Sequence, residues 1–385
     1  MAEPQRAPRG QGRAPPLGER RSAPPLRAPA RRRPRAARAG DSPRGVSVSP
    51  RRRLLLVLVV LSAALLVAAA GALFVGSASI SPSAVVAAVT GRAAPESVER
   101  VVTLAIRLPR IAVAALAGGA LAVAGVGFQA LTRNPLAEPS ILGISAGAAF
   151  GVVIGQSLGL GLTLAEAVGL TGFAFAGAVL AAAAVYLIAA AGPGLSIQTL
   201  LLAGVIVGIF FSAAITVLIS LMDFNRLGGV VHWLLGNLAP VPPGALALFA
   251  LLAAIGFWLV VSHARALNLL ALGEEAAIQL GVGAQRLKLT IFAGAALLTA
   301  SVVAFAGPIG FVGLIVPHAL RMLLGADNRL LVPTSFVGGA IFLLLADTVA
   351  RNVVAPAELS VGVITSFCGA PFFIYLLRTR YRANL

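Results

Sequence analysis

The histidines and the sparse carboxylates are the side chains of this 385-residue chain that would carry metal or acid–base chemistry. His232, His263 and His318 fall on different predicted segments, and neither a cysteine nor a carboxylate cluster accompanies any of them. Protein zinc sites collect three or four such ligands at short spacings. We therefore predict that the chain holds no metal.

The residues required for ATP hydrolysis or nucleophilic catalysis are also missing from the sequence. A phosphate-binding loop needs a glycine-rich turn followed by Lys and then Ser or Thr, whereas Lys288, the only lysine, precedes Leu289. Cys368 is the only cysteine, so an intrachain disulfide is excluded. These absences predict a chain that is not an enzyme and binds no cofactor directly.

A segment at residues 266–282 interrupts the apolar sequence and is too polar to span a membrane. Gly273 and Gly281 bracket a predicted two-turn helix, and Glu274 and Glu275 fall in its first turn, where the helix dipole favours carboxylates. The side chains expected to form a small, smooth face on this helix are Ala276, Ala277 and Leu280. Such a face would seat in a partner's groove; the alternative is an ordinary amphipathic loop helix.

Three arginines stand at predicted outer edges of apolar spans. Arg107 and Arg110 flank a proline, and Arg351 closes a later span. On topology alone, arginines at these depths would bury their methylene groups and extend their charges to the lipid headgroups.

Glycine recurs every four residues along one predicted helix, at Gly143, Gly147, Gly151 and Gly155. This spacing places bare backbone on one helix face, and such faces allow close packing between helices in lipid. Packing within the bundle is the main interpretation, and a lining for a translocation path is the alternative.

The elements that position these residues are predicted to be membrane helices. Hydrophobic residues make up 58% of the chain and charged residues 11%, with a mean hydropathy of +0.95. A membrane helix needs about 20 apolar residues, and the continuous apolar runs disfavour a β-barrel. The ten predicted spans are 54–71, 104–131, 141–158, 168–190, 197–220, 244–262, 288–306, 308–324, 331–350 and 358–377. The predicted fold class is an all-α, polytopic membrane helix bundle.

The net charge of +17 is concentrated in the first 53 residues, which hold fifteen arginines against Glu3, Glu19 and Asp41. This proline-rich tail (residues 1–53) is predicted to be disordered, either plainly solvated or in contact with anionic lipid. Nucleic-acid binding is disfavoured, because arginine bias of this kind marks the cytoplasmic side of membrane proteins. Ten spans then place both termini, including residues 381–385, in the cytoplasm.

Several dispersed motifs carry a family resemblance. They are Arg107-Leu-Pro-Arg110, Arg133-Asn-Pro-Leu-Ala-Glu-Pro139, Leu272–Gly281, Pro317-His318-Ala-Leu-Arg321 and Gly369-Ala-Pro-Phe372. Together they resemble the FecCD-type permeases of ABC importers over roughly residues 54–380, and this stretch is the predicted permease domain. Ser360 departs from the family pattern, which usually has proline there.

The resemblance implies a type II importer-like permease with several partners. These are separate ABC ATPase subunits that use the ATP, an extracytoplasmic substrate-binding protein, and a second permease, either a copy or a paralogue. In that family, the position of residues 273–281 carries the coupling helix that docks on the ATPase. Arginines at the positions of Arg107, Arg110 and Arg351 face glutamates of the binding protein.

The resemblance favours a ferric siderophore as cargo, because it is the commonest cargo of the family; cobalamin and haem are the alternatives with the same mechanism. An ion-coupled secondary transporter is a less favoured class, since it normally needs ionisable groups near the bilayer midplane. Asp223, Asp347 and Glu358 all map near predicted outer edges, and mid-span carboxylates are missing from the prediction.

Overall fold

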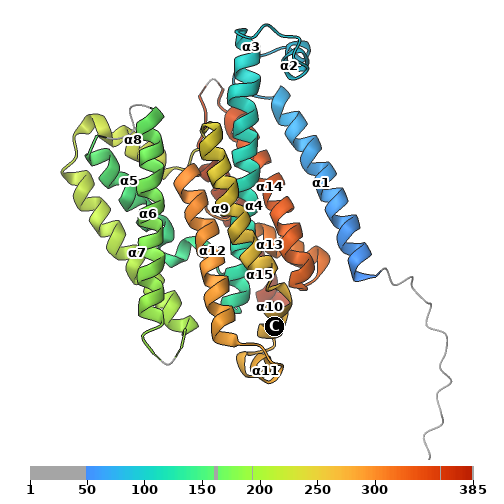
Figure 1. The fold of residues 1–385 in the computed structure, drawn as a ribbon, viewed down its shortest axis with the longest axis vertical. Coiled ribbons are helices and arrows are strands. Elements are labelled where there is room, and N and C mark those ends of the chain that lie inside the picture. Colours follow the sequence, from blue (N-terminus) through green and yellow to red (C-terminus); the bar gives the residue numbers. More distant parts are fainter. Residues whose placement is uncertain (1–48, 160–163, 193, 356, 384–385) are drawn as a thin grey trace, which may run out of the picture. The chain divides into compact units, whose positions relative to one another are not determined.

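Helices make up all the regular structure in the part of the chain that the computed structural model describes, residues 49–159, 164–192, 194–355 and 357–383. Seven helices are long and apolar enough to cross a membrane (Figure 1). They are α1 (Pro50–Phe74), α4 (Leu108–Thr132), α6 (Leu164–Ala189), α7 (Ile197–Ser220), α9 (Pro243–Val261), α12 (Ala284–Ala306) and α14 (Asn328–Asn352). Three shorter apolar stretches belong to α5 (Ile144–Ser157), α13 (Val312–Leu324) and α15 (Val361–Ala383). Each predicted span matches one of these helices, so the prediction of an all-α, polytopic membrane bundle is confirmed.

The helices that form within two of the predicted spans are too short to cross a bilayer alone. α5 has 14 residues and α13 has 13, so at 1.5 Å per residue each covers about 20 Å of a hydrocarbon core of roughly 30 Å. A 3-10 turn, η2 (Pro139–Leu142), leads into α5, and irregular backbone at residues 307–311 leads into α13. Irregular backbone is tolerated at membrane depth only where protein covers it. These two breaks therefore belong to the interior of the bundle.

The interior is built around α4, which packs against α14, α12, α13 and α9. A Cβ added at Gly118 would collide with the carbonyl group of Gly339 on α14, and one added at Gly125 would collide with that of Gly313 on α13. The helix backbones touch at these points, and small residues permit such close packing in lipid. α4, α13 and α14 are consequently held in a fixed relation.

Short helices lie at the two ends of the bundle. At one end are α2 (Pro82–Val89) and α3 (Val98–Arg100), which continues through a π-helical turn, η1 (Val101–Arg107), into α4. At the opposite end are α10 (Ala264–Leu270) and α11 (Glu274–Gln279) (Figure 1). We call these the α2–α3 end and the α11 end.

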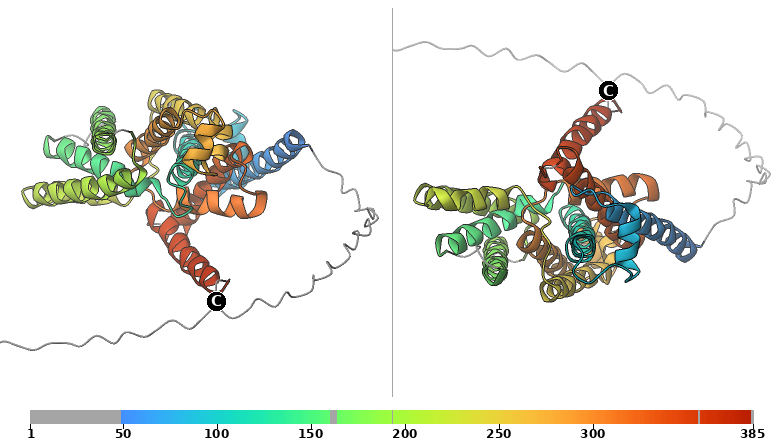
Figure 2. Two further views of the ribbon diagram at one scale, coloured as in Figure 1. Left: turned by 90° about the horizontal axis from the view of Figure 1, so that it is seen from below. Right: turned by 90° about the horizontal axis from the view of Figure 1, so that it is seen from above.

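The remaining elements lie around this interior. α8 (Phe224–Leu234) packs on α5, and α1 packs on α14. Figure 2 shows α5, α6 and α7 grouped on one side of the bundle, with α15 extending away from it in both views. Of the predicted tail (residues 1–53), residues 1–48 lie outside the described residues, and α1 begins at Pro50.

Candidate functional site

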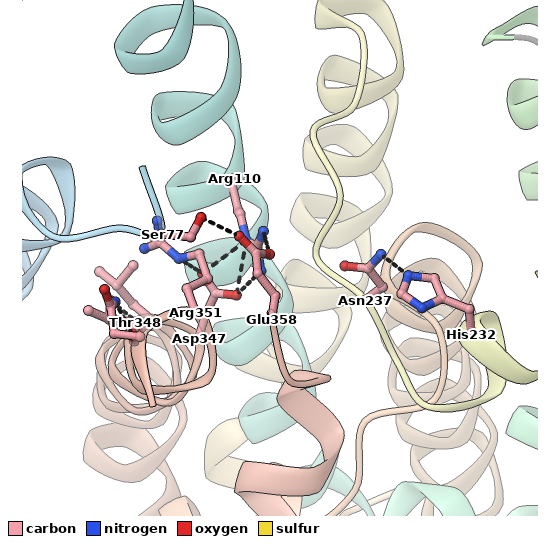
Figure 3. A network of polar contacts seen from close by, with 10 residues as sticks. Ser77, Arg110, His232, Asn237, Asp347, Thr348, Arg351 and Glu358 are labelled. Carbon is pink, nitrogen blue, oxygen red and sulfur yellow. Dashed lines mark hydrogen bonds and ion pairs between the residues drawn. The ribbon is translucent and has the colours of Figure 1, made fainter. Parts of the chain in front are cut away.

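A network of buried charges lies at the α2–α3 end, and we call Arg107, Arg110, Asp347, Arg351 and Glu358 the arginine network. Arg110 donates from Nε and Nη2 to Asp347 Oδ1 at 3.1 and 2.9 Å, and from Nη1 to Glu358 Oε2 at 2.7 Å. Arg351 Nε lies 3.1 Å from Asp347 Oδ2 (Figure 3). One carboxylate, that of Asp347, is thereby shared between two arginines on different helices.

The same network fastens the connection between α1 and α2. Arg107 donates to the carbonyl oxygens of Leu73 and Ala78 at 2.7 and 2.5 Å. Ser77 donates its hydroxyl to Glu358 Oε1 at 2.9 Å (Figure 3). The arginine network therefore joins α4, α14, the α1–α2 connection and the α14–α15 connection.

Burial of these arginines corrects the expectation that they snorkel to headgroups. Arg107, Arg110 and Arg351 are only 3%, 8% and 3% exposed. Internal carbonyl groups and carboxylates replace the headgroups as partners of Arg107 and Arg110, which offsets the cost of removing charge from water. Arg351 has the charge of Asp347 beside it, but its Nε and Nη2 make no hydrogen bond to any residue that the structure describes. Docking of a binding protein on these three residues stays a prediction.

The network also holds three arginines against two carboxylates, which leaves an excess positive charge.

Glu358 is the most exposed carboxylate of the network and lies outside the helices. Its burial opposes ionisation, but the hydrogen bond and charge of Arg110, the hydroxyl of Ser77 and the charge of Arg351 outweigh that effect. Together they hold the pKa of Glu358 below its ordinary value. The carboxylate is consequently ionised at neutral pH.

A second cluster of polar side chains lies at the α11 end, and we call Glu274, Gln285, Lys288 and the peptide group of Leu195 the lysine cluster. Lys288 Nζ lies 2.7 Å from Glu274 Oε1 and donates to the carbonyl oxygen of Leu195 at 2.9 Å. Gln285 donates to Glu274 Oε1 at 3.2 Å and accepts from the backbone N–H of Leu195 at 2.8 Å. The cluster joins α11, α12 and the α6–α7 connection.

The neighbouring helix α10 is fixed by a separate set of bonds. Asn268 donates to Asp327 Oδ1 at 2.7 Å and accepts from the backbone N–H of Asn328 at 2.8 Å. A hydrogen bond from Arg329 is the main reason why the pKa of Asp327 is lowered to about 2, with Asn268 adding to the effect. α10 is thus anchored on the start of α14, while α11 begins at Glu274, directly after Gly273.

The exposed face of α11 differs from the predicted one. Gly273 and Gly281 do bracket the helix, both with positive φ angles, +121° and +84°. Ala277, however, is buried where α11 packs on α10 and α12, so it cannot face a partner. Ala276 is half-buried and Glu275 is exposed. The apolar side chains that α11 and its flanks expose are Leu272, Ile278 and Leu280.

The four regularly spaced glycines divide into two groups. A Cβ at Gly147 or Gly151 would collide with the backbone of α6, and one at Gly155 would come within 3.0 Å of Leu170 Cδ1 on α6. Gly143 instead adopts a φ of +72° ahead of α5 and faces α7. Three of the glycines therefore pack α5 on α6, and the fourth lines a groove.

That groove lies between η2, the start of α5 and one face of α7. Its volume is about 570 Å³, and it is open along one side. Small and hydroxyl-bearing residues contribute much of its lining: Ser140, Gly143, Gly204, Gly208, Ser212 and Thr216. A face of this kind presents close backbone and weak polar groups without a fixed charge.

A carboxylate also lies within the bundle, contrary to the prediction that mid-span carboxylates are missing. Glu138 accepts a hydrogen bond from the backbone N–H of Phe311, which precedes α13. A small cavity beside it is lined by Leu121 of α4 and Thr299 of α12, both near the middle of long helices. The carboxyl group of Glu138 thus meets the positive end of a helix dipole at the junction of two chain breaks.

The histidines lie apart from one another. His232 Nε2 is 2.8 Å from Asn237 Nδ2 (Figure 3), His263 contacts Ser262, and His318 packs against the rings of Phe372 and Phe373. Within the described ranges, no three His, Cys, Asp or Glu residues gather in a metal-binding arrangement.

Lys288, Gln285, Asp347 and Glu358 are the cluster residues that sequence reasoning did not assign to a site. Asp347 and Arg351 are four residues apart, which is the spacing of helical ion pairs, and this spacing was a usable signal. Lys288 and Leu195 are 93 residues apart, so no local pattern pairs them.

Comparison with known proteins places the chain among membrane permeases. The FecCD transport family matches residues 64–379. The chain is 42% identical over 276 residues to the hemin transport system permease protein HmuU of Yersinia pestis, and this match covers 71% of this chain and 82% of that one. The cobalamin import permease BtuC of Halobacterium salinarum is 42% identical over 74% of this chain and 75% of that one.

Two further proteins extend the comparison. The iron(3+)-hydroxamate import permease FhuB of Bacillus subtilis is 41% identical over 72% of this chain and 71% of that one. A solved ABC transporter described as of metal-chelate type, in an inward-facing conformation, superposes with a TM-score of 0.72. That match has 32% identity and covers 84% of this chain and 99% of the solved one.

Proposed function

Because the chain belongs to the FecCD transport family, we propose that it is the membrane-spanning permease of an ATP-driven importer that carries a ferric siderophore across the cytoplasmic membrane. Its membrane helices form the transport path, and separate ATPase subunits bind and hydrolyse the ATP. The permease itself holds no cofactor. Both termini lie in the cytoplasm, which places the α11 end inside and the α2–α3 end outside.

The placement of α11 and of the arginine network at opposite ends of the bundle is the observation that carries this proposal. α11 exposes Leu272, Ile278 and Leu280 at one end of the bundle, and the arginine network lies at the other. An ATPase docking on α11 and a binding protein docking near Arg107, Arg110 and Arg351 would therefore act on opposite ends of the same helices. Alternating access needs that arrangement, because each partner then biases one of two states of the bundle.

The groove beside α7 supports a large cargo with polar edges. Its glycines let a ligand approach the backbone, and Ser140, Ser212 and Thr216 supply hydroxyl groups for weak hydrogen bonds. The open side of the groove fits closure by a second permease, either another copy or a paralogue. Weak, distributed contacts suit a path that must release its cargo.

The siderophore is the proposed cargo, and cobalamin and haem are the alternatives within the same mechanism. The three relatives described above are named for cobalamin, hemin and iron(3+)-hydroxamate, and their identities to this chain differ by one percentage point. The solved relative is described as of metal-chelate type, and this description fits a ferric siderophore, haem and cobalamin alike.

Uptake in a strain lacking this chain tests the proposal. Labelled ferric hydroxamate, cobalamin and haem are supplied separately, each with and without vanadate, which blocks ABC ATPases. Vanadate-sensitive uptake of the ferric complex that the wild-type chain restores is the expected result. Restoration of cobalamin or haem uptake alone would transfer the proposal to that cargo. Uptake that resists vanadate but collapses with a protonophore would contradict an ABC importer.

Replacement of residues 273–281 by a neutral, flexible loop tests the assignment of α11. We expect the variant to insert in the membrane but to lose co-purification with the ATPase and vanadate-sensitive uptake. Full uptake by this variant would show that the ATPase docks elsewhere.

A further inference from the structure

Lys288 is the most buried cation at the α11 end and the only lysine in the chain. It is 3% exposed in the second turn of α12. Removing an ammonium group from water is costly unless good partners replace the water. Lys288 has two such partners, the Glu274 carboxylate of α11 and the carbonyl oxygen of Leu195.

Gln285 repeats the same two connections from the preceding turn of α12. Residues three apart share a helix face, so Gln285 and Lys288 point to the same side. The amide of Gln285 donates to Glu274 and accepts from the backbone N–H of Leu195. Both polar groups of Leu195, its N–H and its carbonyl, are therefore held by the two side chains that also hold Glu274.

Gly194 lies close to the amide group of the exposed Gln285 side chain. A Cβ added at Gly194 would lie 2.7 Å from Gln285 Nε2. A side chain at position 194 would therefore displace the Gln285 amide from its bonds. Glycine at position 194 leaves room for the Gln285 amide to make its bonds to Leu195 and Glu274.

Leu195 lies directly ahead of α7. Ser196 is the N-cap of α7, and its hydroxyl accepts the N–H of Thr199. A displacement of Leu195 consequently moves the first turn of α7, and the later turns of α7 line the groove described above.

The two short helices are attached to the bundle in different ways. α10 is anchored to α14 through Asn268, Asp327 and Asn328, whereas α11 follows Gly273, whose φ of +121° only glycine adopts readily. Glu274 is the first residue of α11 and 34% of its side chain is exposed. A force on α11 would therefore act first on the bond between Glu274 and Lys288.

We propose that the lysine cluster is the joint that transmits the position of α11 to the start of α7, with Lys288 as its positioning residue. The joint rests on the proposed function, in that the force on α11 comes from the ATPase. When α11 moves, the shift of the Glu274 carboxylate changes the bonds that Lys288 and Gln285 make to it, and these two side chains then reposition the Leu195 peptide. The contact between Glu274 and Lys288 forms in the permease alone, so it can be measured without the ATPase.

Acylation of Lys288 measures the state of this joint directly, because no other side chain carries a primary amine. The intact permease in lipid nanodiscs is treated with the N-hydroxysuccinimide ester of acetic acid, and the peptide holding residue 288 is quantified by mass spectrometry. We expect Glu274→Gln to accelerate acylation about tenfold, the factor that loss of one charge-assisted hydrogen bond allows. Glu275→Gln removes the same charge from an exposed neighbour and is expected to leave the rate unchanged. Equal rates for Glu274→Gln and the wild-type chain would overturn the proposed contact.

The same reaction in the assembled importer tests transmission. We expect the acylation rate of Lys288 to differ severalfold between the nucleotide-free complex and the vanadate-trapped complex. We also expect Lys288→Met to keep the ATPase bound while uptake falls. Identical acylation rates in the two states, or full uptake by Lys288→Met, would overturn the joint. Failure of the wild-type permease to co-purify with any ATPase would overturn the proposed function instead, and the nanodisc measurement on the permease alone would still decide whether the cluster forms.

Discussion

The two charge clusters of this bundle differ in what they connect. The arginine network joins long helices that also touch backbone to backbone, as α4 and α14 do at Gly118 and Gly339. The lysine cluster joins a six-residue helix, which follows a glycine with positive φ, to one peptide group of a connection. Figure 1 shows the two sites at opposite ends of the molecule.

Their degrees of enclosure differ as well. Asp347 is completely buried and shared by two arginines, whereas the Glu274 side chain is about one-third exposed, beside a groove of about 560 Å³. Burial of an ion pair makes the loss of one partner expensive, but it does not show whether the pair moves. Whether an ion pair moves depends on the helices and connections that carry its two partners. We therefore interpret the arginine network as a fixed brace and the lysine cluster as a movable joint.

Removal of the shared carboxylate should have the largest effect. Asp347→Ala leaves Arg110 and Arg351 buried without their common partner, which costs about 3–5 kcal/mol for a buried pair. We expect a large fall in the unfolding temperature and in the yield of monodisperse permease after detergent extraction, measured by thermal unfolding and size-exclusion chromatography. Asp223→Ala, at an exposed position ahead of α8, is the control. A stable Asp347→Ala protein would refute the interpretation of this network as a brace.

The backbone contact between α4 and α14 should rank second. Gly118→Ala places a methyl group against the carbonyl group of Gly339, and the helices must separate at a cost of roughly 1–3 kcal/mol. A lower unfolding temperature is the expected readout. Gly172→Ala in α6 meets no atom within 4 Å, and alanine favours helix by up to about 1 kcal/mol over glycine, so this control should be neutral or slightly stabilising. If both variants behaved alike, close backbone packing would not be what fixes these helices.

Double-mutant cycles should separate the brace from the joint quantitatively. The coupling between Arg110 and Asp347 is expected to reach about 3 kcal/mol, whereas that between Glu274 and Lys288 should stay near 1 kcal/mol because solvent screens the exposed carboxylate. Thermal unfolding of each single and double variant to alanine or methionine supplies the four values of each cycle. Equal coupling energies would remove the distinction between the two clusters.

Acidification should weaken the brace through Glu358, with the smallest effect. Its folded pKa lies below the unfolded value, so its contribution is fully present above the unfolded pKa and is lost as the pH falls through the folded pKa. Since Glu358 is partly exposed, we expect less than about 1 kcal/mol. Between pH 6 and pH 3, Glu358→Gln should flatten the decline of the unfolding temperature relative to wild type. Parallel declines would show that other carboxylates control the acid response.

The sequence by itself determined the membrane class and the local elements. Ten apolar stretches predicted the ten main helices, because burial in hydrocarbon is set by local hydropathy. Gly273 and Gly281 predicted the bounds of α11, because glycine readily adopts the positive φ angles at which a helix is entered or left. The motifs also identified the family, which the comparisons confirm over residues 64–379.

Only the tertiary structure decided which partner each buried charge has. Arg110 and Asp347 are 237 residues apart, and Lys288 and Leu195 are 93 apart, so their pairing depends on how α4 packs on α14 and how α12 meets the α6–α7 connection. The same packing turned Ala277 inward, left Ile278 exposed, and shortened two predicted spans into α5 and α13 behind covered chain breaks. Hydropathy specifies that a segment is buried, but the partner of a buried charge is fixed by helix packing across the whole bundle.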